Sequence, residues 1–458
     1  MAKKFLILLL FVFLSYFAVS QNVAHTKQRI SELCSEKYFG RGYIYDGINK
    51  AADYLAEEFQ LIGIQSFTEN SFFQNYSFDI NTFPEDAVVK INDKYLKLGE
   101  DFILNADSPS LIGNYKLFYI DSTTQNDINK FDNLLKSKKL RKCFLVVDKS
   151  AFYENNGLNN FLEIANNNSK MFVGIILLIS EELVSGLSQH QNQFPRIIIK
   201  KEQFSLKTKN ISVSIQSKLL KNFPNKNVIG YIEGEVKDSF FVFSAHYDHI
   251  GGLGKTVFIS GAQDNASGTA LVLDLADFFS KNKPKYSVAF MLFSGEEVGL
   301  LGSSYYVENP LFDLKNIKFL FNLDLVGTGD DGFTLVNGDI KNVKNMKILP
   351  FRSKNTNKDT EIYEKKFNNI ENFEKAQNLI LKINENNNYF PTEKIKLRGG
   401  AANSDHYPFF INGVPCFYIY TLGGKTYYHN IKDKPETLNF GGYNQLFNLL
   451  TNFINQYE

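Results

Sequence analysis

The stretch SFFVFSAHYDH at residues 239–249 decides the fold prediction, because an apolar run ends there in imidazole and carboxylate side chains. Residues 239–245 are almost continuously apolar, which is typical of a strand buried on both faces of a parallel sheet. Three more runs have this character, at residues 286–293, 317–323 and 415–421. Strand-like and helix-like segments alternate from about residue 227 onward, so we predict an α/β fold with a mixed, mostly parallel sheet flanked by helices.

Polar side chains follow these runs at the points where the strands are expected to end. In open parallel sheets, ligands bind in the crevice beyond the carboxyl ends of the strands. Separate segments should therefore deliver imidazoles and carboxylates to one rim. The candidates are His246, Asp264, Glu296, Glu297, Asp324 and His429.

Four carboxylates crowded in an apolar fold would raise one another's pKa values unless cations compensate them. A pair of zinc ions about 3.5–4 Å apart suits mixed nitrogen and oxygen ligands and needs one bridging carboxylate. We predict Asp264 as the bridge. The remaining predicted ligands are His246 with Asp324 on one ion and His429 with Glu297 on the other.

Three further residues are expected to serve the chemistry of this centre. Glu296 neighbours a predicted ligand, so it should take a proton from water and pass it to a leaving amine. Asp248 should accept the second ring N–H of His246 and fix its tautomer. Tyr428 should donate a hydrogen bond to the oxyanion of the tetrahedral intermediate.

The same residues carry a family resemblance. The motifs are AHYDH at 245–249, GAQDNASG at 261–268, SGEEVGLLGS at 294–303, NLDLVG at 322–327, SDHYPF at 404–409 and YHNIKDKPETL at 428–438. In this order they resemble dizinc exopeptidases of the bacterial leucyl aminopeptidase and aminopeptidase Y type. The resemblance implies a zinc-exopeptidase fold of the phosphorylase/hydrolase-like class. It implies the same five ligands, two Zn²⁺ ions per chain, and Glu296 as the catalytic base.

The resemblance also implies a domain division. Residues 21–82, which include FGRG at 39–42, and residues 223–458 should form the catalytic domain. Short apolar runs between them predict an inserted β-rich domain at 83–222, which resembles a protease-associated domain. Asn-rich breaks at 155–160 and 166–168 are expected to be loops. The polar segment 353–390 should form surface loops and one short helix.

The N-terminus and the overall composition limit the location and the partners. Lys3 and Lys4 precede an apolar run of about 15 residues, shorter than the roughly 20 that span a bilayer, so residues 1–20 are predicted to be a signal peptide. We expect an exported protein, secreted, periplasmic or at the cell surface, without a transmembrane anchor after signal removal. The formal charge of +1 indicates no nucleic-acid partner. Three dispersed cysteines suggest no thiolate metal site.

Some polar residues near the motifs are left outside the predicted metal set. His249 and His406 are expected to form hydrogen bonds or to line the cleft rather than to bind metal. Asp405 and His406 are candidates for substrate binding because the SDH motif resembles that of the family, and a structural role in the loop is an equal alternative.

The prediction for function is hydrolysis of the N-terminal peptide bond of peptide substrates by a secreted zinc aminopeptidase. A carboxypeptidase of the same fold stays open, because specificity depends on loops that the motifs do not define. Glutaminyl cyclisation at a single zinc ion is a second alternative. A receptor that had lost the chemistry is a third, although every expected ligand position is filled here. The sequence leaves the oligomeric state open.

Overall fold

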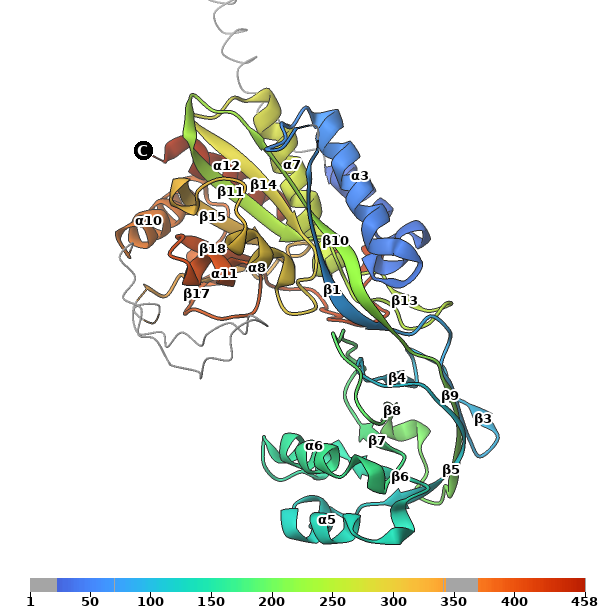
Figure 1. Cartoon of the computed structure of the whole chain (residues 1–458). Helices are drawn as coiled ribbons and strands as arrows, with labels where there is room; N and C mark the ends of the chain where they lie inside the picture. Colours follow the sequence, from blue (N-terminus) through green and yellow to red (C-terminus); the bar gives the residue numbers. More distant parts are fainter. Residues whose placement is uncertain (1–22, 70, 341, 343–369, 458) are drawn as a thin grey trace, which may run out of the picture.

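The computed structural model describes residues 23–69, 71–340, 342 and 370–457 (Figure 1). The predicted signal peptide at 1–20 and most of the first half of the 353–390 segment lie outside these residues. From residue 370, where the sequence predicted one short helix, α10 (Ile370–Asn387) is present and longer than expected. Within the described part of the chain, no helix combines the length and the apolar character needed to cross a membrane.

An eight-stranded sheet forms the larger part of the molecule, in the order β1-β10-β14-β11-β15-β18-β16-β17. Its four central strands run parallel, whereas β10 and β16 pair antiparallel with their central neighbours. The predicted mixed, mostly parallel sheet is therefore confirmed. The strands are β1 (Phe73–Thr82), β10 (Lys218–Ile232), β11 (Val236–His246), β14 (Tyr286–Phe293), β15 (Ile317–Leu323), β16 (Phe333–Val336), β17 (Ile395–Arg398) and β18 (Cys416–Thr421).

Helices cover both faces of this sheet, which explains why its central strands are apolar on both sides. Helix α7 packs on β11 with α3 and α12 beside it, and α11 packs on β15 and β18 with α8 beside it (Figure 1). The helices are α2 (Val23–Leu33), α3 (Gly47–Ile62), α7 (Ser267–Lys281), α8 (Leu301–Glu308), α11 (His406–Ile411) and α12 (Tyr443–Gln456).

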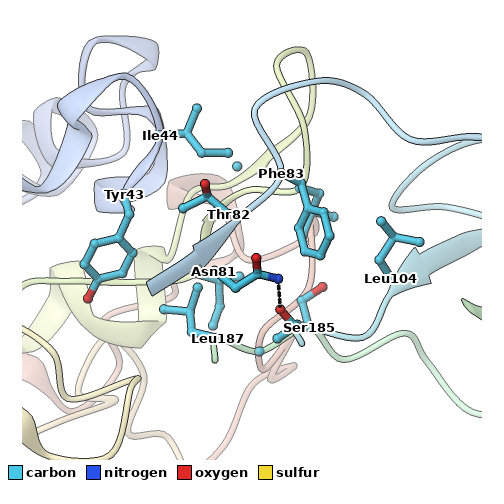
Figure 2. Close-up of a pocket in the computed structure, with 13 residues that line it drawn as sticks. Tyr43, Ile44, Asn81, Thr82, Phe83, Leu104, Ser185 and Leu187 are labelled. Atoms are coloured by element: carbon cyan, nitrogen blue, oxygen red, sulfur yellow. Dashed lines mark hydrogen bonds between the residues drawn. The ribbon is translucent and has the colours of Figure 1, made fainter. Parts of the chain in front are cut away.

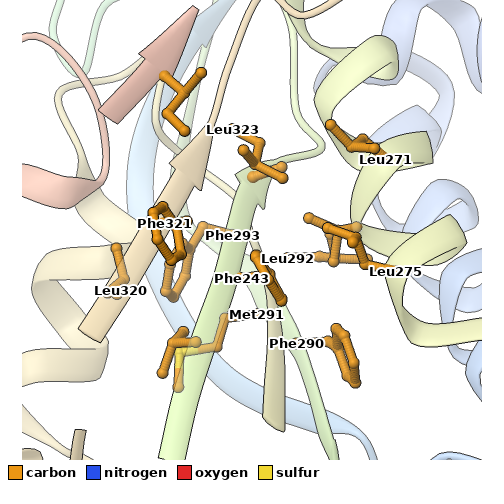
Figure 3. Close-up of a cluster of buried hydrophobic side chains, with 14 of the residues drawn as sticks. Phe243, Leu271, Leu275, Phe290, Met291, Leu292, Phe293, Leu320, Phe321 and Leu323 are labelled. Carbon is orange, nitrogen blue, oxygen red and sulfur yellow. The ribbon is translucent and has the colours of Figure 1, made fainter. Parts of the chain in front are cut away.

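Phenylalanine and leucine side chains fill the core around the central strands and α7 (Figure 3). Phe243 on β11 and Phe321 on β15 are fully buried, and their ring centroids lie 5.8 Å apart. Phe290 on β14 stacks on the other side of Phe243 at 6.4 Å. Burying a side chain of this size contributes about 1.5–3 kcal/mol to the free energy of folding. The rings fix the register of the strands whose ends carry the candidate site.

A second eight-stranded sheet lies between β1 and β10 in the sequence, in the order β3-β2-β9-β5-β6-β7-β8-β4. Its strands β5 to β8 are parallel, and α5 and α6 pack against each other beside them. The elements are β2 (Val88–Ile91), β3 (Lys94–Tyr95), β4 (Phe102–Leu104), β5 (Leu111–Tyr119), α4 (Ser122–Gln125), α5 (Ile128–Leu135), β6 (Cys143–Asp148), α6 (Gly157–Asn167), β7 (Gly174–Ile179), β8 (Arg196–Lys200) and β9 (Asn210–Ile215).

Helix α6 begins within the first Asn-rich break and ends within the second, so the prediction of loops is wrong for residues 157–160 and 166–167. Phe161 and Ala165, four residues apart on the helix, are buried in a separate core of the insert. The Phe161 ring stacks on Phe131 of α5 with a centroid distance of 3.9 Å. Tertiary packing of this apolar stripe outweighs the low helix propensity of asparagine.

The long β1–β10 ribbon links the two sheets. Thr82, the last residue of β1, pairs with Lys218, the first residue of β10. Strand β10 continues through position 223, where we placed the second domain boundary, so the strand extends from the joint into the larger sheet. The division into domains stays a proposal.

Candidate metal centre

The predicted site residues meet at the carboxyl ends of the central strands. His246 is the last residue of β11, the Glu296-Glu297 pair lies three and four residues after β14, and Asp324 directly follows β15. Asp264 lies in a short helical turn, Ala262–Ala266, that leads into α7. Gly268 makes this approach possible, because a Cβ there would lie 2.2 Å from the carbonyl oxygen of Leu323. With the loop after β18 that carries His429, five separate segments supply one cluster.

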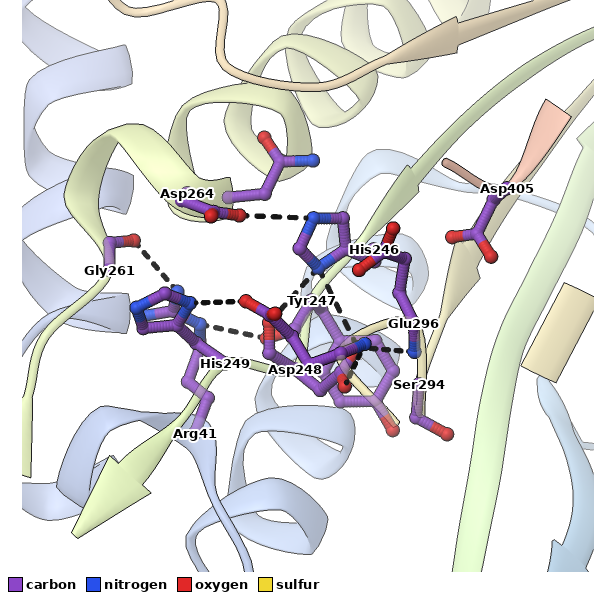
Figure 4. A network of polar contacts seen from close by, with 12 residues as sticks. Arg41, His246, Tyr247, Asp248, His249, Gly261, Asp264, Ser294, Glu296 and Asp405 are labelled. Carbon is purple, nitrogen blue, oxygen red and sulfur yellow. Dashed lines mark hydrogen bonds and ion pairs between the residues drawn. The ribbon is translucent and has the colours of Figure 1, made fainter. Parts of the chain in front are cut away.

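The Asp264 carboxylate lies between the two imidazoles. Its Oδ1 is 3.2 Å from His246 Nε2, and its Oδ2 is 3.2 Å from His429 Nε2. Figure 4 shows the contact between Asp264 and His246. One oxygen of a single carboxylate faces each ring, which is the arrangement that a bridging ligand requires.

Each imidazole has a second carboxylate beside the same nitrogen. His246 Nε2 lies 3.3 Å from Asp324 Oδ1, and His429 Nε2 lies 2.8 Å from Glu297 Oε2. The described residues contain two groups in each of which all the potential ligand atoms lie within 4.8 Å of one another. They are His249, Asp264, Glu297 and His429 in one group and His246, Glu296 and Asp324 in the other.

The tautomers of both imidazoles suit metal binding. His246 Nδ1 donates to the backbone carbonyl of Asp248 at 3.1 Å, and His429 Nδ1 donates to the backbone carbonyl of Ser185 at 3.0 Å. A carbonyl oxygen only accepts, so each Nδ1 carries a proton, and each Nε2 is the nitrogen that faces the carboxylates and would bind a metal ion once deprotonated. The donor set of nitrogen and oxygen atoms therefore fits zinc.

Asp248 has a different contact from the one we expected. Its carboxylate Oδ1 is 3.6 Å from His246 Nδ1, farther than its own backbone oxygen. The carboxylate instead accepts hydrogen bonds from the backbone N–H of Glu296 at 3.2 Å and of Glu297 at 3.4 Å. A buried carboxylate that accepts two amides fixes the turn after β14, and Asp248 therefore positions the Glu-Glu pair as well as His246 (Figure 4).

The electrostatic field of the cluster favours cations. Burial alone would lower the pKa of His246, but Asp324 and Glu296 raise it well above 6.5. Burial disfavours the protonated form of His429, but the carboxylates of Glu297 and Asp264 favour it. The pKa of His429 therefore rises to about 11. Burial, together with the neighbouring carboxylates of Glu297 and Asp324, raises the pKa of Glu296 well above 4.5. Protonated imidazoles and a protonated Glu296 offset negative charge that metal ions would otherwise neutralise.

Buried polar groups that we did not predict hold the ligands. Asp433 accepts from the backbone N–H of Gln263 at 2.9 Å and of Asp264 at 3.1 Å. Ser404 donates to Asp324 Oδ2 at 2.8 Å and accepts from Asn322 at 2.7 Å. Asp433 lies within the motif YHNIKDKPETL and Ser404 within SDHYPF. Their presence in these motifs is the sequence feature from which a role at the site could have been predicted.

Arg41 of the FGRG stretch is buried beneath the site (Figure 4). Its guanidinium donates to the carbonyls of Tyr247 at 2.7 Å, Ser260 at 2.7 Å and Gly261 at 2.8 Å. These carbonyls belong to the two segments that carry His246 and Asp264. Arg41 therefore ties together parts of the chain that are distant in sequence, a role that the FGRG motif alone did not reveal.

His249 lies closer to the centre than we predicted. Its Nδ1 is 2.7 Å from Glu297 Oε1, and its ring lies edge-on to that of His429 with centroids 5.5 Å apart. The side chain is fully buried. The contact is compatible with the expected hydrogen bond to a ligand, and it also places His249 among the potential ligands of the His429 side.

The three remaining predicted site residues differ in environment. The Tyr428 ring, 53% exposed, stacks on His429 with a centroid distance of 3.7 Å. Asp405 is buried, accepts a hydrogen bond from Ser303, and has a pKa raised to about 7 because burial disfavours its charge. Burial lowers the pKa of His406 to about 3, so this imidazole is neutral. Asp405 adjoins the site, whereas His406 packs against Tyr418.

Part of the chain is similar in sequence to known peptidases. Aminopeptidase YwaD of Bacillus subtilis is 34% identical over 149 residues, 32% of this chain and 31% of that protein. A probable zinc metalloprotease of Leptosphaeria maculans is 33% identical over 111 residues, 23% of this chain and 26% of its own. The aligned segments thus span less than a third of the length of these curated relatives.

Solved structures share the fold along nearly the whole chain. The zinc aminopeptidase BSAP of Bacillus subtilis superposes with a TM-score of 0.67 at 19% identity, over 95% of this chain and 94% of that one. An aminopeptidase from Aneurinibacillus sp. strain AM-1 gives a TM-score of 0.62 at 17% identity over the same shares of the two chains. The family model described as peptidase family M28 matches residues 227–454. These residues carry all five predicted ligands, and through them the chain belongs to peptidase family M28.

Proposed function

We propose that the protein is an exported dizinc aminopeptidase that removes the N-terminal residue from peptides. The observation that carries the proposal is the position of the Asp264 carboxylate, with one oxygen toward each imidazole. The matched family and the relatives, an aminopeptidase and a probable zinc metalloprotease, support peptide hydrolysis. His246 with Asp324 and His429 with Glu297 would hold the two ions.

Bound zinc ions would supply Lewis acidity, polarising the scissile carbonyl and lowering the pKa of water toward neutrality. The Glu296 carboxylate would accept the proton of the attacking water and return it to the leaving amine. The raised pKa of Glu296 suits this exchange, because a carboxylate with a higher pKa is a stronger base toward the attacking water. The Asp248 carboxylate holds the Glu296 backbone during both steps.

The substrate's own charges suggest the direction of binding. With both ions bound, the four carboxylates of the cluster would be neutralised, so a protonated peptide amine would be attracted by a carboxylate outside this set. Asp405 has one buried oxygen without a hydrogen bond, beside the oxygen that accepts from Ser303. The Tyr428 ring stacks on His429 and is half-exposed, and we propose that its hydroxyl donates a hydrogen bond to the bound substrate.

The test compares the wild type with Glu296→Gln on aminoacyl and N-blocked peptide substrates, with zinc measured in the same samples. We expect two zinc ions in both proteins and a loss of at least about 100-fold in kcat for the variant, the usual contribution of a general base. Glu308→Gln on α8 is the matched control, because Glu308 is exposed and outside the site. Undiminished activity of Glu296→Gln would overturn the role of Glu296.

The substrate panel separates the alternatives. Turnover of free but not N-blocked peptides supports an aminopeptidase, and equal turnover of N-blocked peptides would instead indicate a carboxypeptidase. A single zinc ion together with cyclisation of N-terminal glutamine would replace the proposal by glutaminyl cyclisation. Export is tested by sequencing the mature N-terminus, which we expect at Gln21, directly after the predicted signal peptide.

A further inference from the structure

The segment between β7 and β8 of the second sheet reaches back to a predicted metal ligand. Ser185 and His429 exchange two hydrogen bonds, since His429 Nδ1 donates to the Ser185 carbonyl at 3.0 Å and the Ser185 N–H donates to the His429 carbonyl at 3.0 Å. The two residues are 244 positions apart. The orientation of the His429 ring therefore depends on a backbone group of the insert.

The same segment, residues 182–189, makes further contacts with the loops around the site. Asn430 donates through its side-chain amide to the carbonyl of Leu183 at 2.8 Å. Gln189 donates to the carbonyl of Val298, the residue after Glu297, at 3.4 Å. Residues 182–189, which we name the docking segment, thus touch the two loops that carry the ligands His429 and Glu297.

Apolar side chains anchor the docking segment at both ends. Leu183 is 2% exposed and packs with Ile103 and Ile179 of the second sheet. Leu187 packs against the core of the larger sheet. A cavity of about 30 Å³, room for about one water molecule, remains beside Ser185 and Leu187 (Figure 2). The joint is therefore nearly filled, and the segment has little freedom to shift while both anchors are in place.

The two imidazoles differ in what orients them. His246 Nδ1 donates to Asp248, two residues along the same segment of the larger sheet. His429 Nδ1 donates to the insert. We propose that the docking segment positions His429, so that binding of the ion on the His429 side depends on the insert, whereas binding on the His246 side does not. The inference rests on the proposed dizinc function and adds a role for the insert.

A hydrogen bond to the non-coordinating nitrogen of a histidine ligand fixes the ring and raises its basicity, and losing such a partner weakens metal binding by about 10–100-fold. Backbone carbonyls cannot be removed by substitution, so the contact must be disturbed through its neighbours. Ser185→Pro deletes the N–H that donates to His429, and Asn430→Ala deletes the donor to Leu183.

The experiment titrates zinc out of the full-length mature protein with a chelator of known affinity and counts the ions that remain. For Ser185→Pro and Asn430→Ala we expect one ion to keep its wild-type affinity and the other to bind about 10-fold or more weakly. Asn412→Ala is the matched control, because the Asn412 amide also donates to a backbone carbonyl at 2.8 Å but lies at the end of α11. It should retain both wild-type affinities.

A second measurement does not depend on zinc. In the metal-free protein, hydrogen exchange of the peptide covering residues 427–433 should be faster in both docking variants than in wild type and in Asn412→Ala. Circular dichroism shows whether each variant folds. If Ser185→Pro does not fold, the comparison of Asn430→Ala with wild type tests the inference. Unchanged exchange together with two wild-type zinc affinities would overturn the inference. Fewer than two ions in the wild type would count against the dizinc function alone, since the exchange comparison would still test the docking.

Discussion

The two sides of the candidate centre are built in different ways. His246 ends a buried central strand, and its neighbour Asp324 directly follows the adjacent strand β15. His429 lies in a loop with a left-handed backbone (φ 51°) and is held by the docking segment of the insert. The His246 side is thus part of the rigid sheet, whereas the His429 side is assembled from parts of the chain that are far apart in sequence. Only Asp264 is common to both.

The largest expected effect comes from the residue that the two sides share. Asp264→Ala removes the carboxylate that faces both imidazoles, so both ions should be lost and activity should fall by at least about 1,000-fold. Zinc analysis and peptide turnover measure the two losses. Asp277→Ala on the exposed face of α7 is the control. If the Asp264 variant kept both ions, the two sides would not share a bridge.

The next prediction compares the two cores. Phe321→Ala in the larger sheet and Phe144→Ala in the second sheet each remove a fully buried ring, which should cost about 3–5 kcal/mol in the free energy of unfolding. Denaturant unfolding measures this cost. Because only the His429 side depends on the insert, Phe144→Ala should weaken one zinc site under native conditions. A loss below about 1 kcal/mol in either variant would show that its core relaxes around the cavity.

A smaller effect is expected on the stability of the folded protein at acidic pH, through His406 beside the site. The buried His406 stays neutral in the folded protein down to a pKa of about 3, whereas in the unfolded chain it takes up a proton near its ordinary pKa of 6.5. Its contribution to stability is therefore complete above about pH 6.5 and is lost as the pH falls toward 3. Between about pH 7 and pH 5, the free energy of unfolding of the His406→Phe variant should fall by about 2 kcal/mol less than that of the wild type. Unfolding curves of both proteins across this range isolate the residue, and parallel losses would contradict the assignment.

The smallest effect concerns the His246 side. Ser404→Ala deletes the hydroxyl that donates to Asp324, so zinc affinity on that side should fall by about 10-fold. The His429-side affinity should remain unchanged, which reverses the pattern expected for Asn430→Ala. Chelator competition measures both affinities, and Ser280→Ala on α7 is the control. Equal weakening of the two ions by Ser404→Ala would show that the sides are coupled.

The sequence predicted the parts of the structure that depend on continuous apolar runs. The limits of β14 and β15 agree with the runs at 286–293 and 317–323, because strands buried on both faces are predominantly apolar along their length. His246 ends β11, Asp324 directly follows β15, and the Glu296-Glu297 pair lies three and four residues after β14. Asp264, before α7, was placed by its spacing from the apolar helix run and by its motif.

Contacts made by backbone groups could not be predicted. The Ser185 carbonyl that holds His429 would be present with any residue at position 185, so the docking segment has no sequence signature. The sequence predicted a contact between Asp248 and His246. It could not show whether the carboxylate or the backbone oxygen of Asp248 accepts from His246 Nδ1, because that depends on local geometry. Helix α6 was missed because its stability comes from packing against α5 rather than from helix propensity.

The most direct test of the central claim is a zinc-edge anomalous diffraction experiment on crystals of the mature protein grown with zinc. The account predicts two anomalous peaks, one beside His246 Nε2 and one beside His429 Nε2, with the Asp264 carboxylate between them. A single peak, or two peaks of which either lies beyond coordinating distance of Asp264, would contradict it.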